Sequence, residues 1–183
     1  NEDLNIKIKG HVGYYCGGMN QKANIIVEGN AGTGLGENMM SGTIHVKGNV
    51  SQSAGATAHG GTIIIDGNAS SRCGISMKGI DIIVKGSVGH MSGFMAQAGT
   101  LLICGNAGEA LGDSIYETII YMAGKPKSLG TDCVEKKITK NDIVKINSLL
   151  KAGNIKKYKA EKFKKYGSAR KLYNFKIDNV SEY

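Results

Sequence analysis

Cysteine and histidine are the residue types of this chain best suited to nucleophilic or metal chemistry, and it has four of each among 183 residues. The cysteines lie far apart in the sequence: Cys16, Cys73, Cys104 and Cys133. None belongs to a C-x-x-C pair, the spacing typical of zinc sites and iron–sulfur clusters. The histidines also lack metal-ligand spacing: His11, His45, His59 and His90. We therefore expect no metal site, and we interpret the histidines as surface or turn residues.

Two further features suggest chemistry at first sight. Arg72 precedes Cys73, and a neighbouring cation can lower the pKa of a thiol and so activate it as a nucleophile. The string GTGLG at residues 32–36 resembles a phosphate-binding loop, but no helical pattern follows whose N-terminus would hold a phosphate. Both features lie within a repeat that accounts for them, so we predict no catalytic and no cofactor-binding residue in this chain.

The repeat is a glycine at every nineteenth position, without a slip in six consecutive intervals: Gly10, Gly29, Gly48, Gly67, Gly86, Gly105 and Gly124. The residues four and two positions before each glycine are apolar, as at Ile25 and Val27. Apolar residues at alternate positions indicate a half-buried strand, because side chains on a strand point to opposite faces. A second glycine follows seven positions later, as at Gly17. We interpret both glycines as corners of the coil, because glycine accepts positive φ without a Cβ penalty.

A fixed period of this length indicates a solenoid. The leucine-rich pattern and the aspartates of calcium-binding coils are absent, and nineteen is not a multiple of six. We therefore predict an all-β fold, a right-handed, single-stranded parallel β-helix with about seven 19-residue coils over residues 1–133. Cys73 holds the position of Leu35 and Ala54 in other coils, which favours interior packing. Asn30 and Asn49 follow the first glycine of their coils and predict an amide ladder along the stack.

The residue three positions before each first glycine should point outward from its strand. Several members of this series are large and apolar, and together they make a stripe that a free monomer seldom exposes. The predicted interface consists of Ile26, Ile64, Ile83, Leu102 and Tyr121. We interpret it as a docking surface for another chain or for the C-terminal tail of the same chain.

Residues 134–153 should contain a helix that caps the C-terminal end of the solenoid, where the last coil would otherwise present an unpaired edge. Thr139 and Asp142 are spaced as a variant of the capping box. Apolar residues such as Ile146 and Leu149 form one face of this helix, and Gly153 supplies its end.

Residues 154–183 form a basic, aromatic arm that carries +6 of the net charge of +8. We expect its aromatic residues to pack on the solenoid or on a partner, with its lysines in solvent. Nucleic-acid binding is the less favoured alternative, because arginine is nearly absent and no RNA-binding motif is present.

The composition also bears on the compartment. No apolar run approaches the length of a membrane span, and no signal peptide opens the chain. Cys16 and Cys73 lie three coils apart, too far for a disulfide. We therefore expect free thiols and a cytoplasmic protein.

The coil pattern G-N-x-x-x-x-x-G…I-x-V-x-G resembles the C-terminal β-helix (GXGXG) domain of the glutamate synthase large subunit. Three strings are more similar to one branch: GHVGYYCGGMN at residues 10–20, SQSAGATAHGG at 51–61 and RCGISMKGI at 72–80. So are GDSIY at 112–116, SLGTDC at 128–133 and YGSARKLY at 166–173. That branch is the stand-alone β-helix subunit of glutamate synthase-like systems, which include N-methylglutamate synthase.

The resemblance implies a multi-subunit enzyme in which this chain is a non-catalytic scaffold. One partner would be a class II glutamine amidotransferase, and the other an FMN-dependent synthase subunit that also carries an iron–sulfur cluster. Ammonia from glutamine would condense with 2-oxoglutarate, and the flavin would reduce the imine. The amine that is used, the electron donor and the stoichiometry stay open. Two alternatives are the related β-helix subunit of formylmethanofuran dehydrogenase, with a molybdenum or tungsten partner, and a nucleic-acid-binding module that uses the basic tail.

Overall fold

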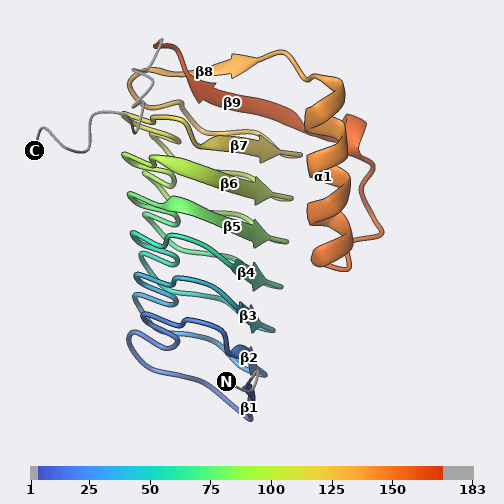
Figure 1. Ribbon diagram of the computed structural model, residues 1–183. Coiled ribbons are helices and arrows are strands. Elements are labelled where there is room, and N and C mark those ends of the chain that lie inside the picture. The colour runs from blue at the N-terminus through green and yellow to red at the C-terminus, as the bar shows by residue number, and fades with distance from the viewer. Residues whose placement is uncertain (1–3, 171–183) are drawn as a thin grey trace, which may run out of the picture.

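The computed structural model describes residues 4–170, which form a column of stacked strands with one long helix along its side (Figure 1). Its strands belong to one sheet, in the order β1-β2-β3-β4-β5-β6-β7-β9-β8. The strands are β1 (Asn5–Ile8), β2 (Asn24–Val27), β3 (Thr43–Val46), β4 (Thr62–Ile65), β5 (Lys78–Val84), β6 (Ala98–Ile103), β7 (Ile119–Met122), β8 (Cys133–Lys136) and β9 (Lys164–Ser168). The helices are α1 (Lys140–Ala152) and the short 3-10 helix η1 (Ala160–Lys162).

The strands β1 to β7 pair in parallel, each with the strand of the next coil. The register joins residues nineteen positions apart, as in Ile25 with Ile44 and Val27 with Val46. The predicted parallel β-helix is therefore confirmed. Its seven parallel strands enclose six complete turns, slightly fewer than the coils expected. A further turn would need another parallel strand beside β7, and the antiparallel β9 occupies that position.

The inward side chains of the strands form the main core. Val27, Ile44 and Val46 are completely buried there. The opposite wall of the column is a second ladder of single-residue bridges: Val12, Ala31, Val50, Ala69, Val88 and Ala107. Both apolar series of the repeat therefore face one interior, and burial of this surface is the main source of the solenoid's stability.

The first glycine of the coil is explained by close approach of neighbouring coils. Gly48 does not have positive φ, and a Cβ atom there would overlap the amide oxygen of Asn30. That Cβ would also lie 2.8 Å from the carbonyl oxygen of Gly29, in the coil before it. The expectation that glycine serves positive φ at this corner was wrong for Gly48, because the coils stack too closely here for any side chain.

The predicted asparagine ladder is present, but its hydrogen bonds run from backbone N–H groups to side-chain oxygens and not from one side-chain amide to the next. The backbone N–H of Asn49 donates to Oδ1 of Asn30 at 2.7 Å, and that of Asn68 donates to Oδ1 of Asn49 at 2.8 Å. Ser87 continues the series with its hydroxyl, which accepts the N–H of Asn106 at 3.0 Å. Each short side chain thus satisfies a backbone donor of the next coil that the strand pairing leaves unpaired.

The second corner has an unusual backbone. Its glycine has positive φ as expected, for example 67° at Gly55. The residues two positions before and after this glycine are left-handed as well, with φ of 60° at Ser53 and 53° at Thr57. Such conformations cost about 1 kcal/mol or more per non-glycine residue. Stacking enforces them, because the N–H groups of Ser53 and Thr57 donate to carbonyl oxygens of the next coil, at Ser71 (3.0 Å) and Ile75 (2.9 Å).

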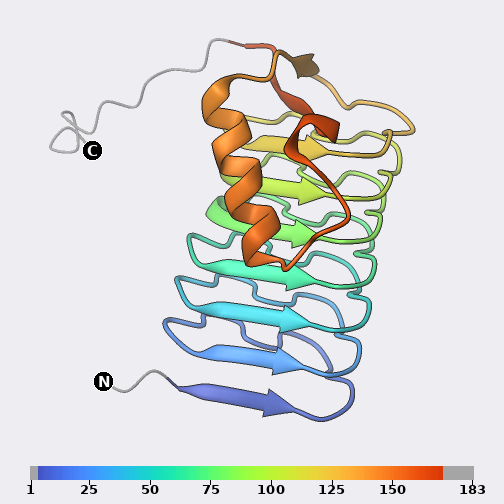
Figure 2. The same ribbon diagram turned by 90° about the vertical axis from the view of Figure 1, so that its right-hand side faces the viewer.

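The C-terminal end of the solenoid is covered by strands and not by the helix. The strand β9 pairs antiparallel with β7, and β8 pairs antiparallel with the outer edge of β9. The helix α1 lies instead against the outward face of the sheet, beside β5, β6 and β7 (Figure 2). It begins with the predicted capping box, in which Thr139 and Asp142 exchange hydrogen bonds, and it ends at Gly153. The sequence placed this helix at the correct residues but over the wrong surface.

Candidate interaction surface

The outward face of the sheet contains the five residues of the predicted interface, and its upper part is covered by the chain itself. Ile64, Ile83, Leu102 and Tyr121 are at most 6% exposed. Their cover is this chain's own α1, which precedes the predicted tail, together with the first part of that tail up to Phe163. Ile26, in the second coil, remains 38% exposed.

The cover consists of α1 and the segment that returns from it to β9. These elements form a second hydrophobic cluster with the outward stripe, separate from the interior of the solenoid. Ile146, Leu149 and Leu150 come from α1, and Phe163 follows η1. Tyr158 and Phe163 lie edge to face, with ring centroids 6.0 Å apart. The predicted packing of the arm's aromatic residues is confirmed for Tyr158, Phe163 and Tyr166, while Tyr173, Phe175 and Tyr183 lie outside the described residues.

A buried carboxylate holds this cover in place. The Asp142 side chain in α1 is 7% exposed, and its carboxylate lies 2.8 Å from the ammonium group of Lys165 in β9. It also accepts hydrogen bonds from the Tyr121 hydroxyl of β7 at 2.5 Å and from the Thr139 N–H at 2.7 Å. Burial would raise the pKa of Asp142, but the hydrogen bonds from Lys165, Thr139 and Tyr121 outweigh it and hold the pKa well below its usual range.

Replacement of Asp142 with asparagine should destabilise the fold by about 2–4 kcal/mol at neutral pH, because it leaves Lys165 with little solvent and no counter-charge. The folded-state pKa of Asp142 is lowered, so its contribution is complete above the unfolded pKa of about 3.9 and is lost as the pH falls below it. Urea denaturation followed by circular dichroism should therefore separate wild type and variant at neutral pH and bring them together at low pH.

The matched control is Asp81→Asn, which removes the partner of Lys145 on the same helix. That pair is partly exposed, at 25% for Asp81 and 39% for Lys145, so its loss should cost less than about 1 kcal/mol. Equal losses in the two variants would show that Asp142 has no special role in fastening α1.

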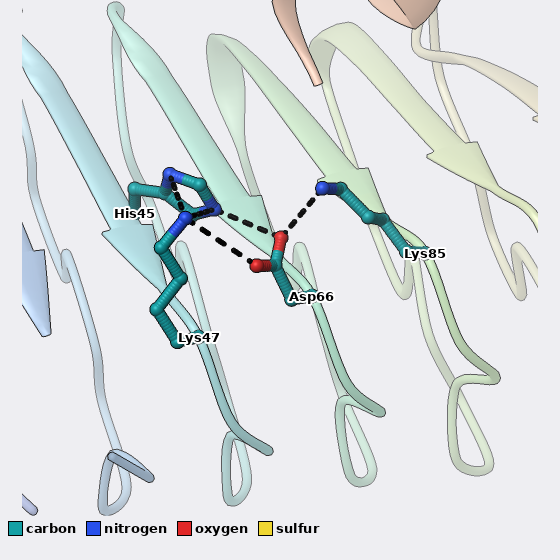
Figure 3. Close-up of polar contacts among 4 residues, drawn as sticks. All are labelled: His45, Lys47, Asp66 and Lys85. Carbon is teal, nitrogen blue, oxygen red and sulfur yellow. Dashed lines mark hydrogen bonds and ion pairs between the residues drawn. The ribbon is translucent and has the colours of Figure 1, made fainter. Parts of the chain in front are cut away.

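The lower part of the outward face is open and carries charges of alternating sign. Lys7 and Glu28 form an ion pair at 2.7 Å between the first two coils. Farther along the column, three basic side chains converge on the carboxylate of Asp66, which follows β4 (Figure 3). They are His45 in β3, Lys47 directly after β3 and Lys85 directly after β5. The strictly repeating coil places Lys47, Asp66 and Lys85 side by side, because equal phases lie on the same line along the column.

Asp66 is the centre of this cluster. Its carboxylate lies 2.7 Å from the Lys85 ammonium, 2.8 Å from Nε2 of His45 and 3.6 Å from the Lys47 ammonium. Burial would raise the pKa of Asp66, but the hydrogen bonds from Lys85 and His45 prevail and lower it. One carboxylate among two lysines leaves an excess of positive charge. Sequence reasoning missed this cluster. Lys47, Asp66 and Lys85 share one phase of the repeat, which could have indicated the ion pairs of Asp66 with the two lysines. His45 belongs to another phase, so the repeat gave no indication of its contact with Asp66.

The features that first suggested chemistry have structural roles. Cys73 is 1% exposed within the core, and burial raises the pKa of its thiol to about 12. It is therefore not an activated nucleophile at neutral pH. The N–H groups of Gly34 and Gly36 donate to the carbonyl oxygens of Gln52 (3.0 Å) and Cys16 (2.9 Å). These two backbone donors of the glycine string are therefore not free to bind a phosphate.

The described part of the chain, residues 4–170, has no group of three or more cysteine, histidine or acidic residues placed to hold a metal ion. Its cysteines are all free thiols. The helices described here are neither long nor apolar enough to cross a membrane.

Residues 2–177 match the family described as GXGXG motif. The chain belongs to the GXGXG family. It is similar to Protein GlxC of Rhizobium meliloti (strain 1021), with 62% identity over 178 residues. The matched region covers 97% of this chain and 78% of GlxC. The glutamate synthase-type GXGXG resemblance identified from the coil pattern is thereby confirmed, and the match includes both the solenoid and the covering segment.

Proposed function

We propose that this GXGXG chain is a structural subunit of a glutamate synthase-type complex, or of an N-methylglutamate synthase-type one. The observation that supports this most directly is the extent of the family match, which takes in nearly the whole chain. The repeat-derived fold supports it as well. The backbone donors of Gly34 and Gly36 and the thiol of Cys73 are used to build the column and are not free for chemistry.

In this proposal the chain holds two catalytic partners in position. One is an FMN-dependent synthase subunit with an iron–sulfur cluster, and the other is a class II glutamine amidotransferase subunit. Both cofactors would belong to the synthase partner. The free thiols of Cys16, Cys73, Cys104 and Cys133 agree with a reducing compartment, and we propose the cytoplasm.

The test is affinity purification of the tagged chain from its source cells, with the co-purifying proteins identified by mass spectrometry. We expect a flavin-containing synthase chain and a glutamine amidotransferase chain. Recovery of a molybdenum or tungsten enzyme would favour the formylmethanofuran dehydrogenase-type alternative and overturn the proposal. Recovery of neither partner by the folded chain would overturn it too.

Ile26 is the member of the predicted interface that remains accessible to a partner. Ile26→Lys should reduce recovery of a partner chain, because it places a charge in an apolar contact. Met95→Lys is the matched control, since Met95 is exposed to a similar degree, at 39% compared with 38% for Ile26, but lies at the second corner. Equal recovery with both variants would remove Ile26 from the interface.

A further inference from the structure

The covering segment has a strongly basic outer surface. Residues 136–162 contain nine lysines, no arginine and two carboxylates, those of Asp142 and Glu161, which gives a formal charge of +7. Asp142 is already neutralised by Lys165. Within residues 4–170, Lys145 is the one lysine of this stretch with a carboxylate partner. Most of the positive charge is therefore uncompensated within the described chain.

The backbone that carries these lysines is packed on the sheet through apolar contacts. Exposed lysines come from both parts of the cover, with Lys140 and Lys151 on α1 and Lys156, Lys157, Lys159 and Lys162 on the return segment and η1. We refer to these six as the basic face. On the opposite side of the same helix, Ile146, Leu149 and Leu150 pack on the sheet, so the segment has one apolar and one cationic side.

The basic face is continuous with the charged cluster on the sheet. Lys85 follows β5 and Cys104 follows β6, nineteen residues later, so the register of these strands places them in neighbouring coils. Cys104 is buried in the outward cluster, and Tyr158, the neighbour of Lys157 in the return segment, packs against the same cluster. Positive charge therefore continues from the cover to Lys85 and Lys47 of the Asp66 cluster (Figure 3). The cluster also contains His45, which pairs with Ile26 in the register of β2 and β3. Concentrated charge of one sign disfavours the compact fold through self-repulsion, and an anionic partner would remove that cost.

We infer that the basic face, together with Lys85, receives an acidic surface of a partner protein. Val144, which is 69% exposed between Lys140 and Lys151 on α1, supplies an apolar contact within it. Nucleic acid fits less well, because the stretch has no arginine for base recognition. Its aromatic residues, Tyr158 and Phe163, are already engaged in the outward cluster. The identity of the partner, a synthase-type or amidotransferase-type chain, rests on the proposed function, whereas its acidic character does not.

Charge reversal at three lysines tests the inference. Lys156→Glu, Lys157→Glu and Lys159→Glu are combined in one variant, because these side chains are exposed and lack ion pairs among the described residues. The matched control combines Lys22→Glu, Lys78→Glu and Lys125→Glu, three exposed lysines elsewhere on the solenoid, with the same change in net charge. Circular dichroism first establishes that both variants are folded.

The affinity of each variant for the purified synthase-type or amidotransferase-type chain is then measured at about 50 and about 400 mM NaCl. We expect the first variant to bind roughly tenfold or more weakly than wild type at low salt, and the control within about threefold. The difference should shrink at high salt, since screening removes the interaction in wild type. Unchanged affinity of the first variant, or equal loss in both variants, would overturn the inference.

Two further measurements separate failure of the inference from failure of the proposed function. If neither partner chain co-purifies, the proposed function fails, and binding of the chain to poly-L-glutamate replaces the partner assay. Wild type and control should then bind while the first variant does not, and absence of binding by wild type would overturn the inference. Tighter binding of a single-stranded DNA, or of vesicles that contain phosphatidylserine, than of the acidic protein would assign the basic face to that other ligand and overturn it as well.

Discussion

Replacement of Ile83 with lysine is expected to release α1 and the return segment from the sheet and to lower the free energy of unfolding by about 4 kcal/mol or more. Ile83 has no exposed surface, and it lies in the outward cluster with Leu149 and Leu150. Burial of an isoleucine side chain contributes about 1.5–3 kcal/mol, which the variant loses. A lysine at this position must also either lose its hydration or displace the helix. Urea denaturation and limited proteolysis within residues 140–163 would measure both effects.

Ile26→Lys is the control, because Ile26 occupies the same phase of the repeat and is 38% exposed. Its replacement should change the free energy of unfolding by less than about 1 kcal/mol. Equal destabilisation by the two substitutions would contradict the conclusion that the chain's own helix covers only the upper part of the stripe. Retention of α1 on the sheet in Ile83→Lys would contradict it in the same way.

The strand positions and the core could be predicted from the sequence because the repeat is strict. A residue's phase determines whether it points into the column, as with Ile44, or out of it, as with Ile64. Each prediction was therefore supported by the corresponding positions of the other coils. Stacking in register then fixed the long-range pairing without any further information, since a slip would misplace the apolar residues of every coil.

The outward contacts could not be assigned in the same way. The pattern identified an apolar stripe, but Ile83 and Leu149 are far apart in the sequence and no periodicity relates them. A helix with one apolar side fits either the end of the column or the face of the sheet. The pairing of Asp142 with Lys165 depends on the same long-range choice. The helix packs on the face because the apolar stripe lies there. The end of the column does not need the helix, because β9 forms hydrogen bonds with the free edge of β7.

The left-handed backbone of the non-glycine residues at the second corner also could not be predicted from the repeat. Ser53, Thr57 and Arg72 share left-handed φ although their side chains have little in common. The conformation is imposed by hydrogen bonds to the next coil, as from the Arg72 N–H to the His90 carbonyl oxygen at 2.9 Å. The residue type reveals the local geometry where a Cβ atom is excluded, as at Gly48.

Replacement of Gly48 with alanine should be among the most damaging single-methyl changes in this chain, lowering the free energy of unfolding by about 3–5 kcal/mol. The new Cβ would overlap the Asn30 amide oxygen, which accepts the Asn49 N–H and cannot withdraw without leaving that donor unpaired. It would also press on the Gly29 carbonyl oxygen, which accepts the Gly48 N–H at 3.0 Å. The two coils would have to separate. Because β2, β3 and β4 pair in one continuous register, this separation would disturb the pairing of the neighbouring strands as well.

Gly13→Ala separates this effect from the general cost or benefit of adding a methyl group. Gly13 lacks positive φ, and a Cβ there would meet nothing within 4 Å. Its replacement should therefore be neutral, or stabilising by up to about 1 kcal/mol through reduced freedom of the unfolded chain.

Removal of the Asn30 side chain in Asn30→Gly/Gly48→Ala should recover part of the loss seen with Gly48→Ala, because it removes one of the two overlaps. Thermal and urea denaturation of wild type, Gly48→Ala, Asn30→Gly and the double variant would measure this coupling. Strict additivity would mean that Asn30 is not what excludes a side chain at Gly48.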